Sequence, residues 1–250
     1  MGPIELWHWA GSAFSSGEHV ILAAALAFQL PAPRIQAEDP GLQVWSTNYV
    51  LHTAHEVDEG DGHAVLAPGN QPFPADDPVH LSARDWCQAA LQGSARVVRQ
   101  DGSVLTITYA TAEETAVDCG PPLGHARWRT QGRVRFGHSV GPWGDGVRGL
   151  HLVPYRTLAT DPTQIPTGSL VYVPSARGVR LQTSEGEIVH DGWFFAADVG
   201  GAIRGLHIDT FTGSERRVGL PQVTNTANET VDAYVVRDEA LARALLRLHE

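Results

Sequence analysis

From about residue 42 onward, the sequence consists of short runs of β-branched and aromatic residues separated by glycine and proline. The chain of 250 residues contains 26 glycines and 16 prolines, and turn residues this frequent leave room only for short regular elements. Strand-like runs are predicted at residues 42–52, 103–109, 168–174, 193–197 and 231–236. Strands that recur at this spacing indicate a β-rich barrel with few helices.

Two helices are predicted, one from start and stop signals and one from an amphipathic pattern. Residues 82–93 begin with Ser82, carry an acidic residue three positions later and end at Gly93, which is the pattern of a capped helix. Residues 238–249 form an amphipathic pattern with four leucines, so the chain is expected to end in a helix.

Composition excludes several classes of function. All 18 basic residues are arginine, and a chain without lysine has no lysine Schiff-base chemistry and no P-loop. The net charge of −10 disfavours nucleic acid as the main partner. Residues 125–156 hold six arginines against one acid. This basic stretch either attracts an anionic polymer or is an ordinary pair of solvated strands.

Cysteine usage and the N-terminal residues bear on the compartment. Cys87 and Cys119 are too few for a disulfide scaffold, but one disulfide is possible in an oxidising compartment. The apolar run 20–30 has 11 residues, which is too short to span a bilayer and fits the core of a signal peptide. Residues 35–37 resemble a cleavage signature. Residues 1–37 are therefore predicted to be a signal peptide or N-terminal extension, with a buried helix as the alternative, and the protein to be exported to the periplasm or cell envelope without a transmembrane span.

A segment near residue 200 carries the strongest chemical signal. Asp198 and Asp209 are separated by 11 positions, with Gly200 and Gly201 between them. This pattern predicts a tight turn joining two strands, each ending in an acid. The paired glycines allow a ligand or another strand to approach the backbone closely. His207 and Asp209 alternate, so on a strand they project from the same face.

This segment resembles the Asp-x-Gly-Gly-Ala-Ile-Lys-Gly…Asp signature of the three-aspartate (3D) domain, which also occurs in the barrel of the membrane-bound lytic transglycosylase A family. Residues 154–168 resemble the same family's Arg-Thr-Ile-Ala-Val-Asp-Pro…Ile-Pro-x-Gly block. The resemblance assigns the three aspartates to Asp161, Asp198 and Asp209. Arg204 stands where the signature has lysine, which keeps the charge and changes the hydrogen-bond geometry.

A third, shorter match concerns the first strand. Residues 46–49 resemble the Thr-Gly-Tyr-Tyr-like opening strand of these barrels, whose threonine and tyrosine line the sugar site. The resemblance implies that Thr47 and Tyr49 contact sugar. Asn48 stands where the lytic enzymes often have glycine.

The family fold is a six-stranded double-psi β-barrel. The resemblance therefore implies a mainly β protein with such a barrel, an inserted α+β segment and a C-terminal helix. The barrel is expected to be discontinuous, and the expected parts are residues 43–53 plus 125–236 for the barrel, 54–124 for the insertion and 237–250 for the helix. The long spacing between the first two aspartates predicts a smaller insert at residues 175–191.

The activity implied by the resemblance is cleavage of peptidoglycan glycan strands between N-acetylmuramic acid and N-acetylglucosamine, with a 1,6-anhydro product and neither cofactor nor metal. Asp209 is expected to act first as general acid and then as base. Asp198 is expected to raise the pKa of Asp209 by repulsion, or to orient it and stabilise positive charge. Asp161 is expected to tie a strand or loop by hydrogen bonds. The substrate-site candidates are Thr47, Tyr49, Asp161, Gly200, Gly201 and His207.

Two other functions stay open at this point. One is a non-catalytic, expansin-like module that binds wall polysaccharide, and the other is an endoglucanase-like glycoside hydrolase on the same barrel. The presence of both Asp198 and Asp209 favours an enzyme, because a binding module needs no acid. The protein is expected to act as a monomer.

Overall fold

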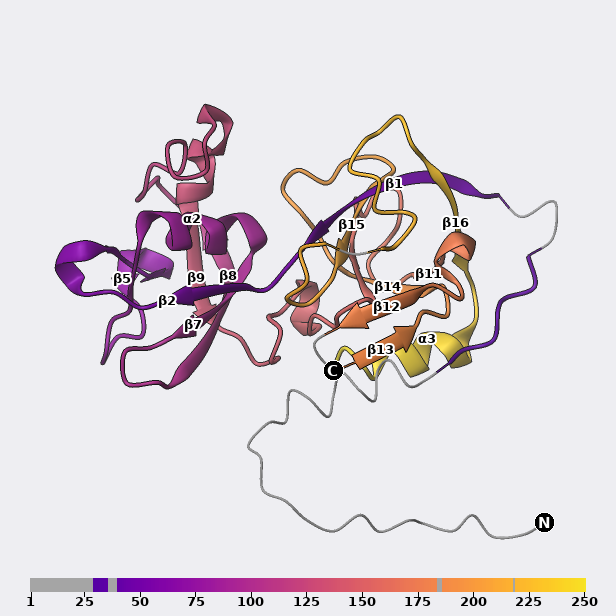
Figure 1. Ribbon diagram of the computed structural model, residues 1–250, viewed down its shortest axis with the longest axis horizontal. Coiled ribbons are helices and arrows are strands. Elements are labelled where there is room, and N and C mark those ends of the chain that lie inside the picture. Colours follow the sequence, from indigo (N-terminus) through magenta and orange to yellow (C-terminus); the bar gives the residue numbers. More distant parts are fainter. Residues whose placement is uncertain (1–28, 36–39, 184–185, 218) are drawn as a thin grey trace, which may run out of the picture.

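The computed structural model describes residues 29–35, 40–183, 186–217 and 219–250. Figure 1 shows two units side by side, a barrel built mainly from the later part of the chain and a second unit built around a smaller sheet. Strand β1 belongs to the barrel and runs on directly into β2 of the second unit. The second unit is therefore an insertion that leaves the barrel after its first strand.

The barrel is closed by six strands in the order β1-β15-β10-β14-β11-β16. Their bounds are β1 Leu42–Tyr49, β10 Thr157–Ala159, β11 Leu170–Tyr172, β14 Trp193–Asp198, β15 His207–Phe211 and β16 Val231–Val236. Strands β1 and β15 are parallel, as are β10 and β14, and the other four pairs are antiparallel. The predicted six-stranded barrel is confirmed, and the double-psi connectivity stays a prediction.

Alternation along the strands separates the barrel core from the face that carries polar groups. On β15, Ile208 and Thr210 are fully buried, whereas His207 and Asp209, which alternate with them, are partly exposed. Thr210 is paired inside by Ser46 of β1, with 2.9 Å between the two hydroxyl oxygens. The side-chain period of two therefore places the acid and the histidine together on the accessible face.

The second unit has a four-stranded sheet in the order β2-β7-β8-β9. Its strands are β2 His52–His55, β7 Ser94–Val98, β8 Val104–Ala112 and β9 Val134–His138. Helix α2, Ala83–Gln92, packs on this sheet through Trp86, whose ring meets Phe136 of β9 edge-on at 5.5 Å. Cys87 of α2 and Cys119 are joined by a disulfide. The insertion thus begins two residues earlier than the predicted residue 54, and it also includes β9, which the sequence assigned to the barrel.

Both predicted helices are confirmed, and the caps expected for residues 82–93 are present. Ser82 accepts a hydrogen bond from the Asp85 amide at the start of α2, and Gly93 ends it with φ of +83°. Helix α3, Glu239–Leu246, begins at Asp238, whose carboxylate accepts from two backbone amides. Caps of this kind satisfy the free amides and carbonyls of helix ends.

The remaining elements are short. The hairpin of β12 Arg180–Thr183 and β13 Gly186–Val189 stands outside the barrel sheet, in the place predicted for a smaller insert. The two-residue strands are β3 His63–Ala64, β4 Leu66–Ala67, β5 Gln71–Pro72 and β6 His80–Leu81. The 3-10 turns are Glu59–Asp61, Pro68–Asn70, Ala126–Arg133, Val147–Gly149 and Pro174–Ala176.

The predicted signal peptide falls mostly outside the described residues, of which only 29–35 belong to it. Those residues pack on the barrel. Leu30 is buried, and its amide donates to Asp191 at 2.9 Å. The Pro31 carbonyl accepts from the Trp193 indole at 2.8 Å. A cut after residue 37 would therefore remove a segment that covers part of the barrel.

Candidate active site

Strands β1 and β15 bring Thr47 and Asp209 together. The parallel register pairs Thr47 with Asp209, and the Thr47 hydroxyl oxygen lies 2.9 Å from Asp209 Oδ1, to which it donates when the carboxyl group is ionised. The sequence predicted that Asp209 ends its strand, and this is wrong. Asp209 is the middle residue of β15, because the strand continues through Phe211 to complete its pairing with β1. A mid-strand position fixes the carboxyl group more firmly than a strand end.

Asp198 lies at the end of β14, as predicted. Its Oδ2 accepts a hydrogen bond from the Tyr49 hydroxyl at 2.8 Å. Strand β10 runs between β14 and β15, and Ala159 of β10 is the register partner of both Asp198 and Asp209. The two acids therefore stand at one level of the barrel, two strand spacings or about 10 Å apart at Cα, with a small side chain between them.

The electrostatics of this pair differ from those of surface carboxylates. Burial raises the pKa of Asp209 to about 7; repulsion from Asp198 adds to the rise, and the hydrogen bond from Thr47 opposes it. Burial also raises the pKa of Asp198 to about 6, against the hydrogen bonds from Tyr49 and the Val199 amide. Desolvation therefore dominates both shifts, and the predicted repulsion is the smaller cause. Near pH 7 Asp198 is mostly ionised, whereas Asp209 is distributed between its acid and base forms.

Tyr49 is placed to orient Asp198. Its ring is buried and lies 5.1 Å from the Phe211 ring, and proximity to both acids together with burial holds the pKa of its hydroxyl well above the usual value. The hydroxyl is thus a permanent donor to Asp198. Contact of Tyr49 and Thr47 with sugar stays a prediction.

Asp161 lies in the loop after β10 and binds the turn between β14 and β15. It accepts from the Gly205 amide at 2.8 Å, and from the amide and hydroxyl of Thr163 at 3.0 and 2.7 Å. These bonds lower the pKa of Asp161. Asp161 therefore stays ionised and holds the loop and the turn in place.

The turn itself is tight at one of its two glycines. A β-carbon on Gly200 would lie 2.4 Å from the Ile203 side chain, whereas one on Gly201 would meet no atom within 4 Å. Arg204, in the position of the signature's lysine, donates to the carbonyls of Gly200 and Ile203 at 3.1 and 2.7 Å. The guanidinium thus braces the turn, and a role of the two glycines in substrate binding stays a prediction.

His207 lies beside Asp209, as the alternation predicted. Its Nε2 is 3.0 Å from the Thr47 hydroxyl oxygen, so Thr47 contacts both. The sequence analysis missed Trp45, whose ring stacks on that of His207 with centroids 3.7 Å apart. The signal was present, because Trp45, Thr47 and Tyr49 alternate along one strand.

The basic stretch 125–156 does not present a uniform charged surface. Arg135 and Arg156 are each 1% exposed. Arg156 forms a buried ion pair with Asp191, and Arg135 donates to Asn70 and to backbone carbonyls. At least two of the six arginines are therefore structural.

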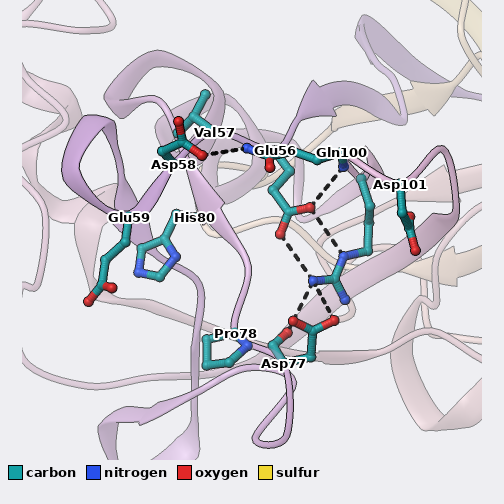
Figure 2. Close-up of a pocket in the computed structure, with 10 residues that line it drawn as sticks. Glu56, Val57, Asp58, Glu59, Asp77, Pro78, His80, Gln100 and Asp101 are labelled. Atoms are coloured by element: carbon teal, nitrogen blue, oxygen red, sulfur yellow. Dashed lines mark hydrogen bonds and ion pairs between the residues drawn. The ribbon is translucent and has the colours of Figure 1, made fainter.

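A cavity of about 320 Å³ lies in the second unit, and Asp161, Asp198 and Asp209 do not line it. Figure 2 shows Glu56, Asp77 and Gln100 converging there. Arg99 bridges the two acids, with Nη2 3.1 Å from Glu56 Oε1 and 2.9 Å from Asp77 Oδ2. Arg99 thus pairs with two of the five acids that line the cavity. Across the described residues, no three histidine, cysteine or acidic side chains are arranged to hold a metal, and no helix is long and apolar enough to cross a membrane.

Comparison with known proteins identifies the later part of the chain. The family model of the 3D domain matches residues 156–236. These residues form a 3D domain. The match includes Asp161, Asp198 and Asp209, and it covers five of the six barrel strands.

Solved structures extend the likeness to most of the chain. One match is the crystal structure of E. coli MltA with bound chitohexaose, at 18% sequence identity and a TM-score of 0.50. The alignment covers 78% of this chain and 72% of the MltA chain. The membrane-bound lytic murein transglycosylase from Agrobacterium tumefaciens is 16% identical, with coverage of 81% and 76% and a TM-score of 0.51. A search of curated proteins found no match. The 3D domain therefore sits in a chain with an MltA-like fold.

Proposed function

We propose that this protein is a peptidoglycan lytic transglycosylase that uses Asp209 as its general acid and base. The observation that carries the proposal is the arrangement of Asp209 and Asp198, which stand at one level of the barrel and are held by the hydroxyls of Thr47 and Tyr49. Burial, which raises the pKa of Asp209 to about 7, supports it. A carboxyl group with that pKa can both give and take a proton near neutral pH. The MltA-like fold and the 3D domain support the same reaction class.

The reaction needs one group to act twice. Protonated Asp209 donates its proton to the glycosidic oxygen as the bond to C1 of the muramic residue breaks and an oxocarbenium-like state develops. The resulting carboxylate then accepts the proton of the muramic 6-hydroxyl, whose oxygen forms a bond to C1. The leaving sugar keeps the first proton, Asp209 regains one, and the product is a 1,6-anhydro sugar without addition of water.

Asp198 supplies negative charge near the reacting sugar in this scheme. It is the more acidic of the two groups, and Tyr49 fixes its orientation. An ionised carboxylate beside the sugar stabilises a positive charge that develops at C1. The hydrogen bond between Thr47 and Asp209 fixes the orientation of the second acid.

The proposal extends to substrate and compartment. The relative from E. coli binds chitohexaose, a linear oligosaccharide, which supports glycan strands as the partner here. The disulfide between Cys87 and Cys119 supports folding in an oxidising compartment, and therefore export to the periplasm or cell envelope.

Product analysis tests the proposal. The full chain and Asp209→Asn are incubated with purified peptidoglycan, and soluble products are analysed by mass spectrometry. Anhydromuramyl products that fall at least 1000-fold in the variant are expected. Asp232→Asn, at an exposed position on β16, is the control and should act like the wild type. Products with free reducing ends would mean a hydrolase, and retained glycan binding without products would mean a binding module.

A further inference from the structure

His207 is connected to Asp209 through a single hydroxyl group. Along the paired strands β1 and β15, Trp45 faces His207 and the next pair on the same face is Thr47 with Asp209. The Thr47 oxygen lies 3.0 Å from His207 Nε2 and 2.9 Å from Asp209 Oδ1. The three side chains thus form a short chain of hydrogen bonds, in which Thr47 is the middle member.

One hydrogen has to serve two contacts of Thr47. A threonine hydroxyl carries a single hydrogen and donates only one hydrogen bond. If Thr47 donates to His207 Nε2, the contact with Asp209 is a hydrogen bond only when Asp209 carries a proton on Oδ1. If His207 carries a hydrogen on Nε2, Thr47 is free to donate to an ionised Asp209. The two states of the imidazole therefore favour opposite states of the carboxyl group.

The surroundings of His207 favour the first arrangement. Burial lowers the pKa of His207, partly offset by a hydrogen bond to the Ala202 carbonyl. Because Nε2 faces Thr47, the nitrogen that donates to Ala202 is Nδ1. A neutral imidazole with its hydrogen on Nδ1 has an acceptor at Nε2. The Trp45 ring, stacked on the imidazole with 4° between the planes, keeps it in this orientation.

We propose that His207 is a positioning residue that keeps Asp209 in its protonated form. By accepting the hydrogen of Thr47, the imidazole leaves Asp209 to supply the hydrogen of the next bond. This is the form a general acid needs before the glycosidic bond breaks. That consequence rests on the proposed function, whereas the effect on the protonation of Asp209 is a property of the folded chain alone.

The other groups that face Asp209 do not produce this effect. Asp198 of β14 repels the charged form, and Tyr49 of β1 is bonded to Asp198. Strand β10 presents Ala159. Arg204, in the turn before His207, donates to two backbone carbonyls, and within the described residues no cation forms an ion pair with Asp209. His207 is therefore the remaining titratable group whose state reaches Asp209 through hydrogen bonds.

Carboxyl titration by carbon-13 NMR of the full chain labelled at aspartate tests the proposal, with Asp209→Asn to assign the signal. His207→Phe keeps a ring that can stack on Trp45 and removes the nitrogen. We expect the Asp209 titration midpoint to fall by about one pKa unit, a tenfold change in the ionised fraction. In a Thr47→Val background, His207→Phe should cause no such shift. An unchanged midpoint for His207→Phe, or the same shift without the Thr47 hydroxyl, would overturn the proposal.

A second measurement needs no variant. Nitrogen-15 NMR of the wild-type imidazoles at pH 6.5 identifies which nitrogen of His207 carries hydrogen. Hydrogen on Nδ1 with a bare Nε2 is expected, and hydrogen on Nε2 would overturn the proposal. Both readouts are independent of lytic activity. A chain that makes no anhydro product but shows these signals would refute the proposed function and leave the role of His207 intact.

Discussion

Two buried environments in the barrel shift the pKa of aspartate in opposite directions. Asp191 is fully buried, and burial by itself raises the pKa of this carboxyl; hydrogen bonds and charge from Arg156 outweigh burial and lower it. Asp209 is less buried, yet its pKa rises to about 7. The difference is the partner, because Asp191 has a cation and two backbone amides whereas Asp209 has one hydroxyl. Partners rather than depth therefore separate a structural acid from a reactive one.

The two environments also respond to pH with opposite signs. Since the folded-state pKa of Asp191 is depressed, its contribution to stability is present above the unfolded value near 4 and is lost as the pH falls through the folded pKa. The folded-state pKa of Asp209 is raised, so its contribution to stability is fully present below the unfolded value near 4. That contribution is lost as the pH rises through the folded pKa of about 7. A single chain thus holds one carboxyl that stabilises the fold at neutral pH and one that destabilises it.

The largest effect is expected from removing the cation of the structural pair. Arg156→Met leaves Asp191 buried and unpaired, which should cost about 3–5 kcal/mol of unfolding free energy. Urea denaturation at pH 7.5 measures it. Arg180→Met at the exposed pair with Glu187 is the control and should change stability by about 1 kcal/mol or less. Equal effects of the two substitutions would contradict the contrast.

The next largest loss of stability is expected from removing the N-terminal segment, whose Leu30 amide donates to Asp191. Deleting residues 1–37 removes the Leu30 amide from Asp191 and exposes the surface that Leu30 covers. A stability loss of about 3 kcal/mol is expected, from one charge-assisted hydrogen bond and one buried leucine. Deleting residues 1–28 keeps these contacts, so the chain of residues 29–250 is the reference against which the loss is measured. If both deletions behave alike, the segment does not contribute to the structural site.

Neutralising Asp209 should raise the unfolding free energy, whereas the two preceding changes should lower it. Asp209→Asn is expected to raise stability at pH 8 by an amount on the order of 2 kcal/mol, after allowance for solvent screening, and to abolish activity. At pH 3.5 the carboxyl is protonated in both states, so the gain should vanish. Asp191→Asn is the matched control and should destabilise the fold at pH 8. A neutral or harmful effect of Asp209→Asn on stability at pH 8 would refute the raised pKa.

The smallest effect is expected at the donor to Asp198. Tyr49→Phe keeps the ring beside Phe211 and removes the hydroxyl that lowers the pKa of Asp198. The Asp198 titration should therefore move above 6, by about one pKa unit or less, equivalent to about 1.4 kcal/mol. Carboxyl NMR measures the shift. Tyr155→Phe removes a hydroxyl that donates to Glu215 and not to Asp198, so it should leave the Asp198 titration unchanged.

Sequence reasoning predicted the acids better than their surroundings. Asp198, Asp209 and Asp161 are visible because turn residues and spacing are local, and a motif records them directly. The dominance of burial over repulsion at Asp209 depends on side chains from three strands, which no local pattern reveals. Trp45 was missed although its alternation with Thr47 and Tyr49 was visible, because the ring that it contacts, that of His207, lies on a strand far along the chain.

The boundaries of the insertion show a second limit. Residues 42–52 read as one continuous strand because no glycine or proline interrupts them, yet the chain leaves the barrel after Tyr49 and joins another sheet at His52. Strand β9 lies within the arginine-rich stretch and pairs with β8. Which sheet a strand joins is decided by long-range pairing, so propensity alone does not report it.

The pairing of β1 with β15 has a consequence for how the chain reaches its native state. Thr47 and Asp209 are 162 positions apart, whereas β7 and β8 of the second unit are neighbours in a hairpin. Contacts between distant residues form slowly, because the intervening chain loses entropy when its ends meet. The inserted unit can thus assemble before the first barrel strand pairs with β15. The contact between Asp209 and the Thr47 hydroxyl therefore depends on closure of the barrel, and a chain whose barrel is open carries every residue of the site without the geometry that its chemistry needs.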